Sequence, residues 1–312
     1  MRSAVLSIVA VLSSALLLAQ QPTRPAITGI AFMRVYTTDP SAAQNFYGKT
    51  LGFERREADG LWIYPVNKLQ WIEVIPHPGP ENNHMMAAVA FTTRDAAGLQ
   101  RYLAAHGVKA EQPLHDGEFS VRDPEGNLII FVQSTAAHPS NKSDKPGSIA
   151  KLVADAPPSA NATSQRVIHV GFIVRDPDSE ATFWRGLLGF RPYWHGGRQP
   201  GETDWISQQV PDGSDWLEFM LRVKEPVDLH QSGTSDHLSL GEEKMTDALA
   251  ALARNGCAGP NCTRTQFGHD GKVQLNLFDP DQTRIEFMEF KPTRTPCCSD
   301  FTGPHPGPDE SQ

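Results

Sequence analysis

Beyond its first twenty residues the chain has no apolar run near the ~18 residues that cross a bilayer. It also has no run of Lys and Arg, and its net charge is −8. Because nucleic-acid-binding proteins usually carry a basic face, this charge argues against a polyanionic partner. Hydrophobic residues still make up 39% of the chain, enough for a globular core. An integral membrane protein, a coiled coil and a wholly disordered chain are excluded, and a small molecule is the expected partner.

The first nineteen residues have the pattern of a secretory signal. A single Arg2 precedes apolar and small residues that continue to Ala19. We therefore expect residues 1–19 to be a signal peptide, cleaved after Ala19, and the mature protein to be exported to the periplasm or the medium. An uncleaved membrane anchor is the alternative.

Cysteine is scarce, and the four cysteines all lie in the last fifth of the chain. An even, clustered set in an exported protein predicts disulfide bonds. Three pairings are possible, and a bond from Cys257 or Cys262 to the adjacent Cys297 and Cys298 would tie the C-terminal tail to the preceding domain. The C-x4-C and C-C spacings do not suit a four-cysteine zinc site.

Two segments, Val35–Phe53 and Phe172–Phe190, resemble each other along their whole length. In each, Asp-Pro follows an alternating apolar run, and Leu-Gly-Phe begins twelve residues after the Asp. Alternation predicts a strand, Asp-Pro predicts the start of a helix, and the glycine predicts its end.

Each copy repeats this plan within itself. A second strand and helix end at Gly107 in the first copy and at Gly256 in the second, and another Asp-Pro precedes each final strand. Four such units predict an α+β fold of two tandem domains, over residues 27–133 and 166–290. Residues 134–165, rich in Ser, Ala and Pro, are expected to be a linker, and residues 291–312 a Pro-rich tail.

Four residues of the second domain occupy equivalent places in its two halves. The opening strands carry His169 and His237, which are 68 residues apart, and the closing strands carry Glu218 and Glu286 with the same separation. If each half curls its sheet into half a cup, these side chains face one centre. Two imidazoles and two carboxylates suit one divalent ion, such as Fe, Mn, Zn or Ni, so we predict a metal site there.

The first domain offers an internal comparison. Its matching positions hold Phe32, Glu73, Ala88 and Ile130. Three of these side chains cannot bind a metal, so we expect the ion in the second domain only. Because Glu73 persists without the other ligands, a glutamate at this place can serve packing alone, and Glu218 is the ligand with the weakest support.

With these motifs in place, the sequence resembles the vicinal oxygen chelate superfamily, which includes glyoxalase I, bleomycin and fosfomycin resistance proteins, and extradiol ring-cleaving dioxygenases. The resemblance covers about residues 27–133 and 166–290. It rests on the opening strands, the aromatic pair of the helix, Leu-Gly-Phe, the Asp-Pro turns and the His/Glu positions. It implies a glyoxalase-like fold, in which paired βαβββ modules form a curled sheet around a metal. It also implies metal-assisted chemistry on a substrate that chelates through two adjacent oxygens.

The resemblance leaves three functions open. The His-Glu-His-Glu set is similar to glyoxalase I, which implies a lyase or isomerase in which Glu286 or Glu218 moves the proton. The two-domain plan is more similar to the extradiol dioxygenases, which implies a metal triad of His169, His237 and Glu286. The third possibility is a non-catalytic protein that sequesters a small molecule, like some resistance proteins.

The dioxygenase signature places a His and then a Tyr before the final Glu. His269 fits the His and is, with Glu286, a candidate catalytic residue, but Asn276 stands where the Tyr should be. The missing tyrosine removes a proton donor. Three neighbouring tryptophans could line the cup: Trp184, Trp194 and Trp205. For Trp184, which lies on the predicted helix, packing in the core is the favoured interpretation.

Overall fold

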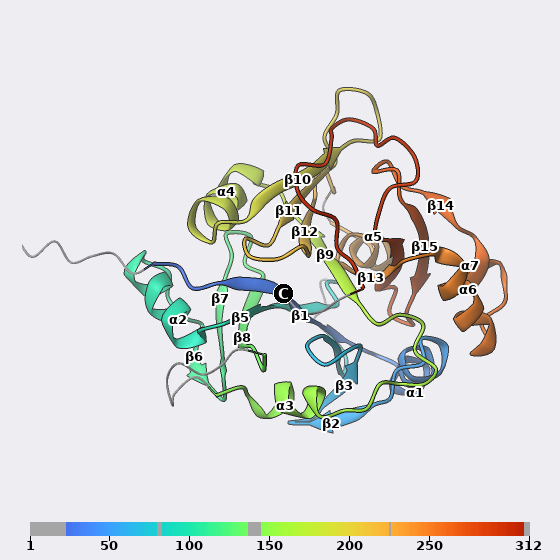
Figure 1. The fold of residues 1–312 in the computed structure, drawn as a ribbon, viewed down its shortest axis with the longest axis horizontal. Coiled ribbons are helices and arrows are strands. Elements are labelled where there is room, and N and C mark those ends of the chain that lie inside the picture. The colour runs from blue at the N-terminus through green and yellow to red at the C-terminus, as the bar shows by residue number, and fades with distance from the viewer. Residues whose placement is uncertain (1–22, 80–82, 137–144, 225, 309–312) are drawn as a thin grey trace, which may run out of the picture.

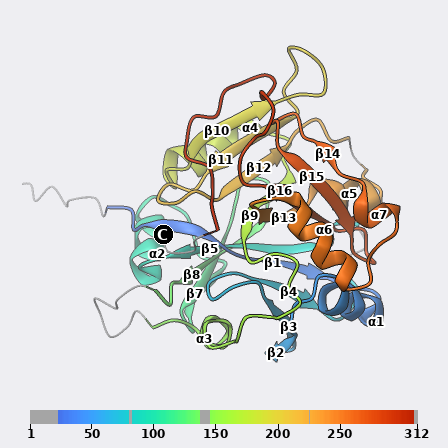
Figure 2. The same ribbon diagram turned by 45° about the vertical axis from the view of Figure 1, so that its right-hand side comes forward.

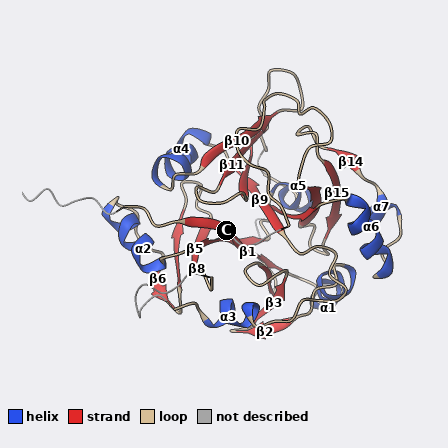
Figure 3. Ribbon diagram, viewed as in Figure 1, coloured by secondary structure: helices blue, strands red, loops and turns tan. Residues whose placement is uncertain are grey.

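The computed structural model describes residues 23–79, 83–136, 145–224 and 226–308, so the expected signal peptide lies outside the described residues. It contains two eight-stranded sheets (Figure 1). Strands form the middle of the molecule, and most helices lie around the outside (Figure 3). Among the described residues, no helix is both long enough and apolar enough to span a membrane.

The first sheet and its helices follow one another along residues 27–133. In chain order they are β1 (Ile27–Tyr36), α1 (Pro40–Ala43), η1 (Gln44–Thr50), β2 (Arg56–Ala58), β3 (Leu61–Pro65), β4 (Trp71–Ile75), β5 (Met86–Thr93), α2 (Ala96–Ala105), β6 (Gln112–His115), β7 (Glu118–Arg122) and β8 (Leu128–Gln133).

A short helix, α3 (Ser148–Ala154), separates this domain from the second. The second set comprises β9 (Val167–Ile173), α4 (Pro177–Ala181), η2 (Thr182–Leu187), β10 (Arg191–Gly196), β11 (Trp205–Gln209), β12 (Trp216–Met220), α5 (Leu229–Ser235), β13 (His237–Glu242), α6 (Met245–Arg254), α7 (Pro260–Thr263), β14 (Gln266–Phe267), β15 (Val273–Phe278) and β16 (Arg284–Glu289).

The two sheets have the same topology. Their strand orders are β2-β3-β4-β1-β5-β8-β7-β6 and β10-β11-β12-β9-β13-β16-β15-β14. In each sheet two βαβββ modules meet where the first strand of one lies antiparallel to the first strand of the other, β1 against β5 and β9 against β13. The predicted α+β fold of paired modules is therefore confirmed.

The Asp-Pro motifs begin helices as predicted. The side chains of Asp39 and Asp176 each accept a hydrogen bond from a backbone N–H of the first turn, at 2.9 and 3.1 Å. The proline after each Asp occupies the first turn, where its missing N–H costs nothing. Both helices, which continue as the π-helical turns η1 and η2, end before a glycine with φ near +77°: Gly52 (φ 76°) and Gly189 (φ 78°).

The two domains share one apolar core. Trp184 is fully buried in it, and its ring lies 5.3 Å from that of Phe91 in the first domain and 4.8 Å from that of Phe190. Such aromatic pairs contribute roughly 0.5–1.5 kcal/mol beyond the area they bury. The core-packing interpretation of Trp184 is therefore confirmed, and this residue does not line the cup.

The segment that follows each sheet covers that sheet's inner face. After the first sheet, helix α3 places Ala150 and Val153 in a buried cluster with Phe32 and Ala88. This helix lies inside the region expected to be only a linker. After the second sheet, the tail, red in Figures 1 and 2, runs beside β10 and packs Phe301 near Tyr193.

All four cysteines are oxidised, as expected, and of the three possible pairings the structure has the one that does not tie the tail to the domain. Cys257 pairs with Cys262, and Cys297 pairs with Cys298. Each bond is local, so neither closes a long loop. The tail is held by hydrogen bonds instead: Ser299 Oγ binds the backbone of His195, and the Thr302 N–H donates to the carbonyl of Tyr193 at 3.0 Å.

Candidate metal centre

The four predicted ligands lie on four neighbouring strands of the second sheet, and their polar atoms converge. The Nε2 atoms of His169 on β9 and His237 on β13 are 2.9 Å apart. Glu286 on β16 places Oε2 3.2 Å from His169 Nε2, and Glu218 on β12 places Oε2 3.6 Å from His237 Nε2. The curled sheet therefore brings together residues that are far apart in the sequence.

Glu218, the ligand with the weakest support from the sequence, belongs to the tightest group. One ligand atom each from His169, Glu218 and His237 lie within 4.8 Å of one another. Glu286 joins this group through its contact with His169. The structure therefore groups three of the four predicted ligands and places the fourth, Glu286, against His169.

Both histidines are buried and suited to bind a cation as neutral rings. Burial lowers the pKa of His237 well below its usual value, and burial also lowers the pKa of His169 although Glu286 opposes the shift. His237 Nδ1 lies 2.9 Å from the carbonyl of Ser235, which fixes the proton on Nδ1 and leaves the Nε2 lone pair facing the cluster. The ring of His169 stacks on Trp216 at 4.7 Å.

The two carboxylates differ in their protonation. Burial, together with the negative charge of Glu286, raises the pKa of Glu218 to about 8. Burial alone would raise the pKa of Glu286 too, but Arg284 and His169 outweigh it and hold that pKa below its usual value. Two buried neutral imidazoles, the buried Glu286 and the partly exposed Glu218 offer a donor set that fits a divalent cation.

The strand registers confirm which first-domain residues match these ligands. His169 pairs with Trp216 in the second sheet, and Phe32 pairs with Trp71 in the first, so Phe32 is the equivalent of His169. Glu286 pairs with Ser239, and Ile130 pairs with Ala90, so Ile130 is the equivalent of Glu286. The equivalent of Glu218 is Glu73, and the equivalent of His237 is Ala88.

Glu73 has a structural partner in place of a metal. It is paired with Arg34, and it accepts a hydrogen bond of 2.7 Å from Trp71 Nε1. In the second domain Gly171 occupies the position of Arg34. An arginine therefore lies in the first cup where the second cup leaves room for the His237 ring.

A pocket of about 350 Å³ opens onto Glu218 and Glu286. Its walls combine aromatic side chains with polar and charged ones, which suits a small organic molecule that has a flat part and polar groups. Two of the predicted tryptophans line it, together with four further aromatic residues; the six are Tyr193, Trp194, Trp205, Trp216, Phe267 and Phe301. The last of these comes from the tail, so the tail forms part of the pocket.

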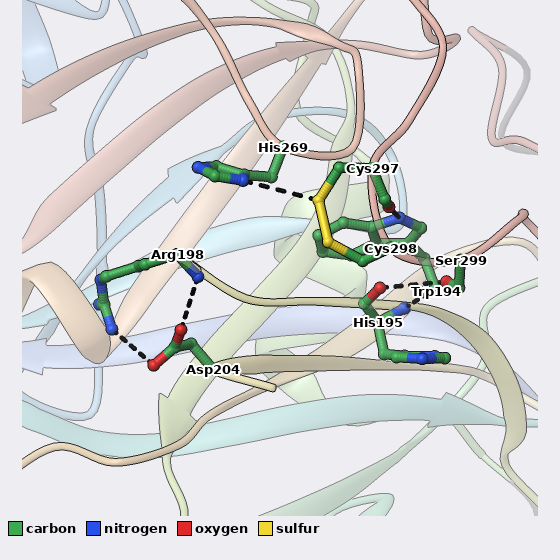
Figure 4. The surroundings of a disulfide bond; sticks show 8 residues. All are labelled: Trp194, His195, Arg198, Asp204, His269, Cys297, Cys298 and Ser299. Carbon is green, nitrogen blue, oxygen red and sulfur yellow. Dashed lines mark hydrogen bonds and ion pairs between the residues drawn. A yellow bond between two sulfur atoms is a disulfide. The ribbon is translucent and has the colours of Figure 1, made fainter. Parts of the chain in front are cut away.

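His269 also lines this pocket, but it contacts the adjacent disulfide rather than the ligand cluster. Its Nδ1 lies 3.7 Å from Cys297 Sγ, as Figure 4 shows, and its carbonyl accepts a hydrogen bond from the Cys297 N–H. Trp194 Nε1 donates to the Cys297 carbonyl at 3.2 Å. The catalytic role of His269 stays a prediction.

A lysine that the sequence did not single out lies behind the pocket wall. Lys272 is fully buried, and its Nζ lies over the rings of Trp216 and Phe301, at 4.3 and 5.4 Å from their centroids. Burial lowers its pKa to about 8, although the charges of Asp270 and the two glutamates of the cluster act in the opposite direction.

Solved structures similar to this chain include extradiol dioxygenases. A variant of homoprotocatechuate 2,3-dioxygenase from B. fuscum has 18% identity and a TM-score of 0.59, with 91% of this chain and 75% of that chain covered. The complex of this enzyme from Brevibacterium fuscum with 3,4-dihydroxyphenylacetate has 18% identity and a TM-score of 0.58, with coverages of 91% and 84%. The enzyme from Arthrobacter globiformis has 18% identity and a TM-score of 0.57, with coverages of 86% and 82%. At this identity the likeness shows the fold alone.

None of the curated proteins compared with the chain matches it. The family model described as the Glyoxalase/Bleomycin resistance protein/Dioxygenase superfamily matches residues 29–131 and 166–287. These two segments are the two curled sheets, and they make up most of the chain. The protein therefore belongs to the glyoxalase/bleomycin resistance protein/dioxygenase superfamily.

Proposed function

We propose that the protein is a metal-dependent enzyme with glyoxalase-like lyase or isomerase chemistry on a small substrate that chelates through two adjacent oxygens. The observation that carries the proposal is the convergence of Glu218 with His169, His237 and Glu286. Four protein ligands leave two positions on an octahedral ion, enough for two substrate oxygens. A bound divalent ion would act as a Lewis acid that makes a hydrogen next to a carbonyl easier to remove.

The two glutamates of the cluster would have different roles in catalysis. A group that moves a proton works best when its pKa is near the operating pH, and without a metal the pKa of Glu218 is about 8. Its Oε2 is 3.6 Å from the nearest histidine nitrogen, a looser contact than that of Glu286. Glu218 is therefore the better candidate for a ligand that would leave the ion to accept the proton, while Glu286 would stay ionised as a ligand. Changing Glu286 to Gln should leave the fold intact and abolish turnover.

A ring-cleaving dioxygenase is the second candidate, and the fold likeness over most of the chain favours it. Such an enzyme needs three open positions on iron, for two substrate oxygens and dioxygen, and so only His169, His237 and Glu286 as ligands. Glu218 would then stay unbound inside a group of ligand atoms only 4.8 Å across. Asn276, paired in register with Glu286, offers an amide where a phenol is expected. Both observations make this the weaker candidate.

Two assays separate these functions. Protein loaded with Mn²⁺, Fe²⁺, Zn²⁺ or Ni²⁺ should catalyse deuterium exchange into 2-hydroxyacetophenone in D₂O, measured by NMR against enzyme-free controls. Glu218→Gln should slow this exchange without losing the fold. Oxygen uptake with catechols by the Fe²⁺ form, and no exchange, would favour the dioxygenase instead. A protein that binds ligands in the pocket without any metal would be a sequestering protein.

We also propose that the protein is exported. The pattern of residues 1–19 and the two disulfides support this location, because disulfides persist in oxidising compartments. Fractionation of the host cells, with N-terminal sequencing of the mature chain, tests it. A mature chain that begins after Ala19 in the exported fraction is expected, and full-length protein in the cytosol would contradict it.

A further inference from the structure

Arg284 on β16 is a nearly buried guanidinium without a hydrogen-bond acceptor among the described residues. Its side chain is 12% exposed, it lines the pocket, and its Nε is buried without a partner. The nearest carboxylate oxygen, Glu286 Oε1, is 3.8 Å from Nη1, beyond hydrogen-bonding distance. A buried donor left unpaired is costly, so this group is positioned to receive an acceptor from outside the chain.

Two other arginines, one in the first cup and one at the exposed side of the same pocket, do have a carboxylate at hydrogen-bonding distance. Arg34 in the first cup pairs with Glu73, and Arg198 at the same pocket as Arg284 binds Asp204 at 2.9 Å. Arg284 is different because Glu286, its neighbour on the strand, is turned toward His169.

The position of Arg284 is specific to the second cup. Leu238 pairs with Ile285 in parallel register, so Arg284 is the strand neighbour of His237. Arg284 and Glu286 both line the pocket, as alternate residues of one strand do. In the first domain Leu128 holds the equivalent position. The first cup therefore has an apolar side chain where the second cup has this guanidinium.

The balance of charges around the pocket also favours the binding of an anion. A divalent ion would balance Glu218 and Glu286. Asp270 in the pocket wall and Lys272 behind it carry opposite charges, and each favours the charged form of the other. The positive charge of Arg284 is then left over in a largely buried site, where an unbalanced charge is unfavourable.

We propose that Arg284 binds a carboxylate of the substrate, and that the substrate class is 2-hydroxy or 2-oxo carboxylic acids. One carboxylate oxygen and the oxygen on the adjacent carbon would form the chelating pair, and the second carboxylate oxygen would accept hydrogen bonds from the guanidinium. The aromatic walls would hold the rest of the molecule. This inference rests on the proposed function, because it requires a metal between the ligands.

Mandelate and 1-phenylethane-1,2-diol test this assignment. Both offer two adjacent oxygens and a phenyl ring, but only mandelate carries a carboxylate. Calorimetric titration of Mn²⁺-loaded wild-type protein should show mandelate binding at least tenfold more tightly than the diol. Arg284→Gln should weaken mandelate binding by roughly 10- to 100-fold, the usual value of hydrogen bonds to charged groups, and leave diol binding unchanged.

Two further variants serve as controls. Arg284→Lys keeps the charge and should retain part of the preference. Arg198→Gln removes a guanidinium from the same pocket that Asp204 already balances, and should change mandelate affinity less than about threefold. Thermal melting of each variant reports whether it folds. Because a carboxylate oxygen binds Mn²⁺ more strongly than a neutral hydroxyl does, the metal alone also favours mandelate, so the test of Arg284 is the loss of this preference in Arg284→Gln relative to wild type.

The outcomes are distinguishable. If the protein binds Mn²⁺ but wild type shows no preference for mandelate, or Arg284→Gln weakens both ligands equally, the carboxylate subsite is wrong while the proposed function survives. If elemental analysis finds that the wild type binds no divalent metal, the proposed function fails and this inference fails with it.

Discussion

The ring of His237 lies against the α-carbon of Gly171 on the adjacent strand. A β-carbon at position 171 would lie 2.1 Å from His237 Cε1 and 2.5 Å from Nδ1, closer than real contacts allow. The first domain has Arg34 and Ala88 at these two positions. The glycine and the histidine therefore act as a pair, in which the missing side chain makes space for the imidazole ring.

Gly171→Ala should displace the His237 ring. We expect at least tenfold weaker metal binding and a loss of about 1–3 kcal/mol in the free energy of unfolding, because the new methyl group overpacks the sheet. Gly186→Ala is the matched control: its β-carbon would meet no atom within 4 Å, so metal binding and stability should be nearly unchanged. Calorimetry and urea unfolding measure both effects. Unaltered metal affinity in Gly171→Ala would contradict the proposed ligand role of His237.

Metal binding should release a proton from Glu218. At pH 7 the carboxyl group of Glu218, with a pKa of about 8, is mostly protonated, whereas the lowered pKa values of both histidines leave them neutral and that of Glu286 leaves it ionised. A cation requires the deprotonated form, so about one proton should leave at pH 7 and almost none at pH 9.5. Calorimetry in buffers of different ionisation enthalpy counts the protons. Glu218→Gln should abolish the release, and an undiminished release in that variant would show that another group supplies the proton.

How far the sequence predicts this molecule depends on the kind of residue. The repeat and the Asp-Pro motifs are local signals, so they predicted the modules, and the equal spacing of His169, His237, Glu218 and Glu286 predicted the cluster. Gly171 carries no such signal. Its role is to leave space for the ring of His237, and this space is evident only when the two strands are paired.

Partners across long loops were harder to predict. The sequence could not show that Arg284 lacks an acceptor, because that depends on how Glu286 turns in the folded sheet. The sequence did show that Arg284 lies two residues before Glu286, so that both side chains lie on the same face of a strand. The disulfide pairing could not be predicted either, because four cysteines allow three pairings. In the structure both bonds are local.

The two disulfides should contribute differently to stability. Replacing Cys257 and Cys262, five residues apart, with serine should cost about 2 kcal/mol in the chain-entropy model. The adjacent pair Cys297 and Cys298 constrains almost no loop, so the same double change there should cost less. Denaturant unfolding compares the two variants. Thiol titration of the denatured wild type without reductant should find no free thiol, and four free thiols would refute the assignment.

The first cup should stay without metal even after single changes. Phe32→His restores one ligand, but Ala88 and Ile130 supply none, and Val153 of helix α3 is buried in the same cluster. We expect the metal content of this variant to equal that of wild type. A second bound ion per chain, found by elemental analysis, would show that the covering helix is no obstacle and that the active half is wrongly assigned.

The most direct test of the whole account is the metal content of three purified proteins. Wild type and Glu73→Gln should each hold about one divalent ion per chain, since Glu73 serves only Arg34 and Trp71. The double variant His169→Ala, His237→Ala should hold none while its circular dichroism still shows the folded sheets. A wild-type protein that binds no divalent metal, or equal loss of metal from Glu73→Gln and the double variant, would contradict the metal centre assigned to the second cup.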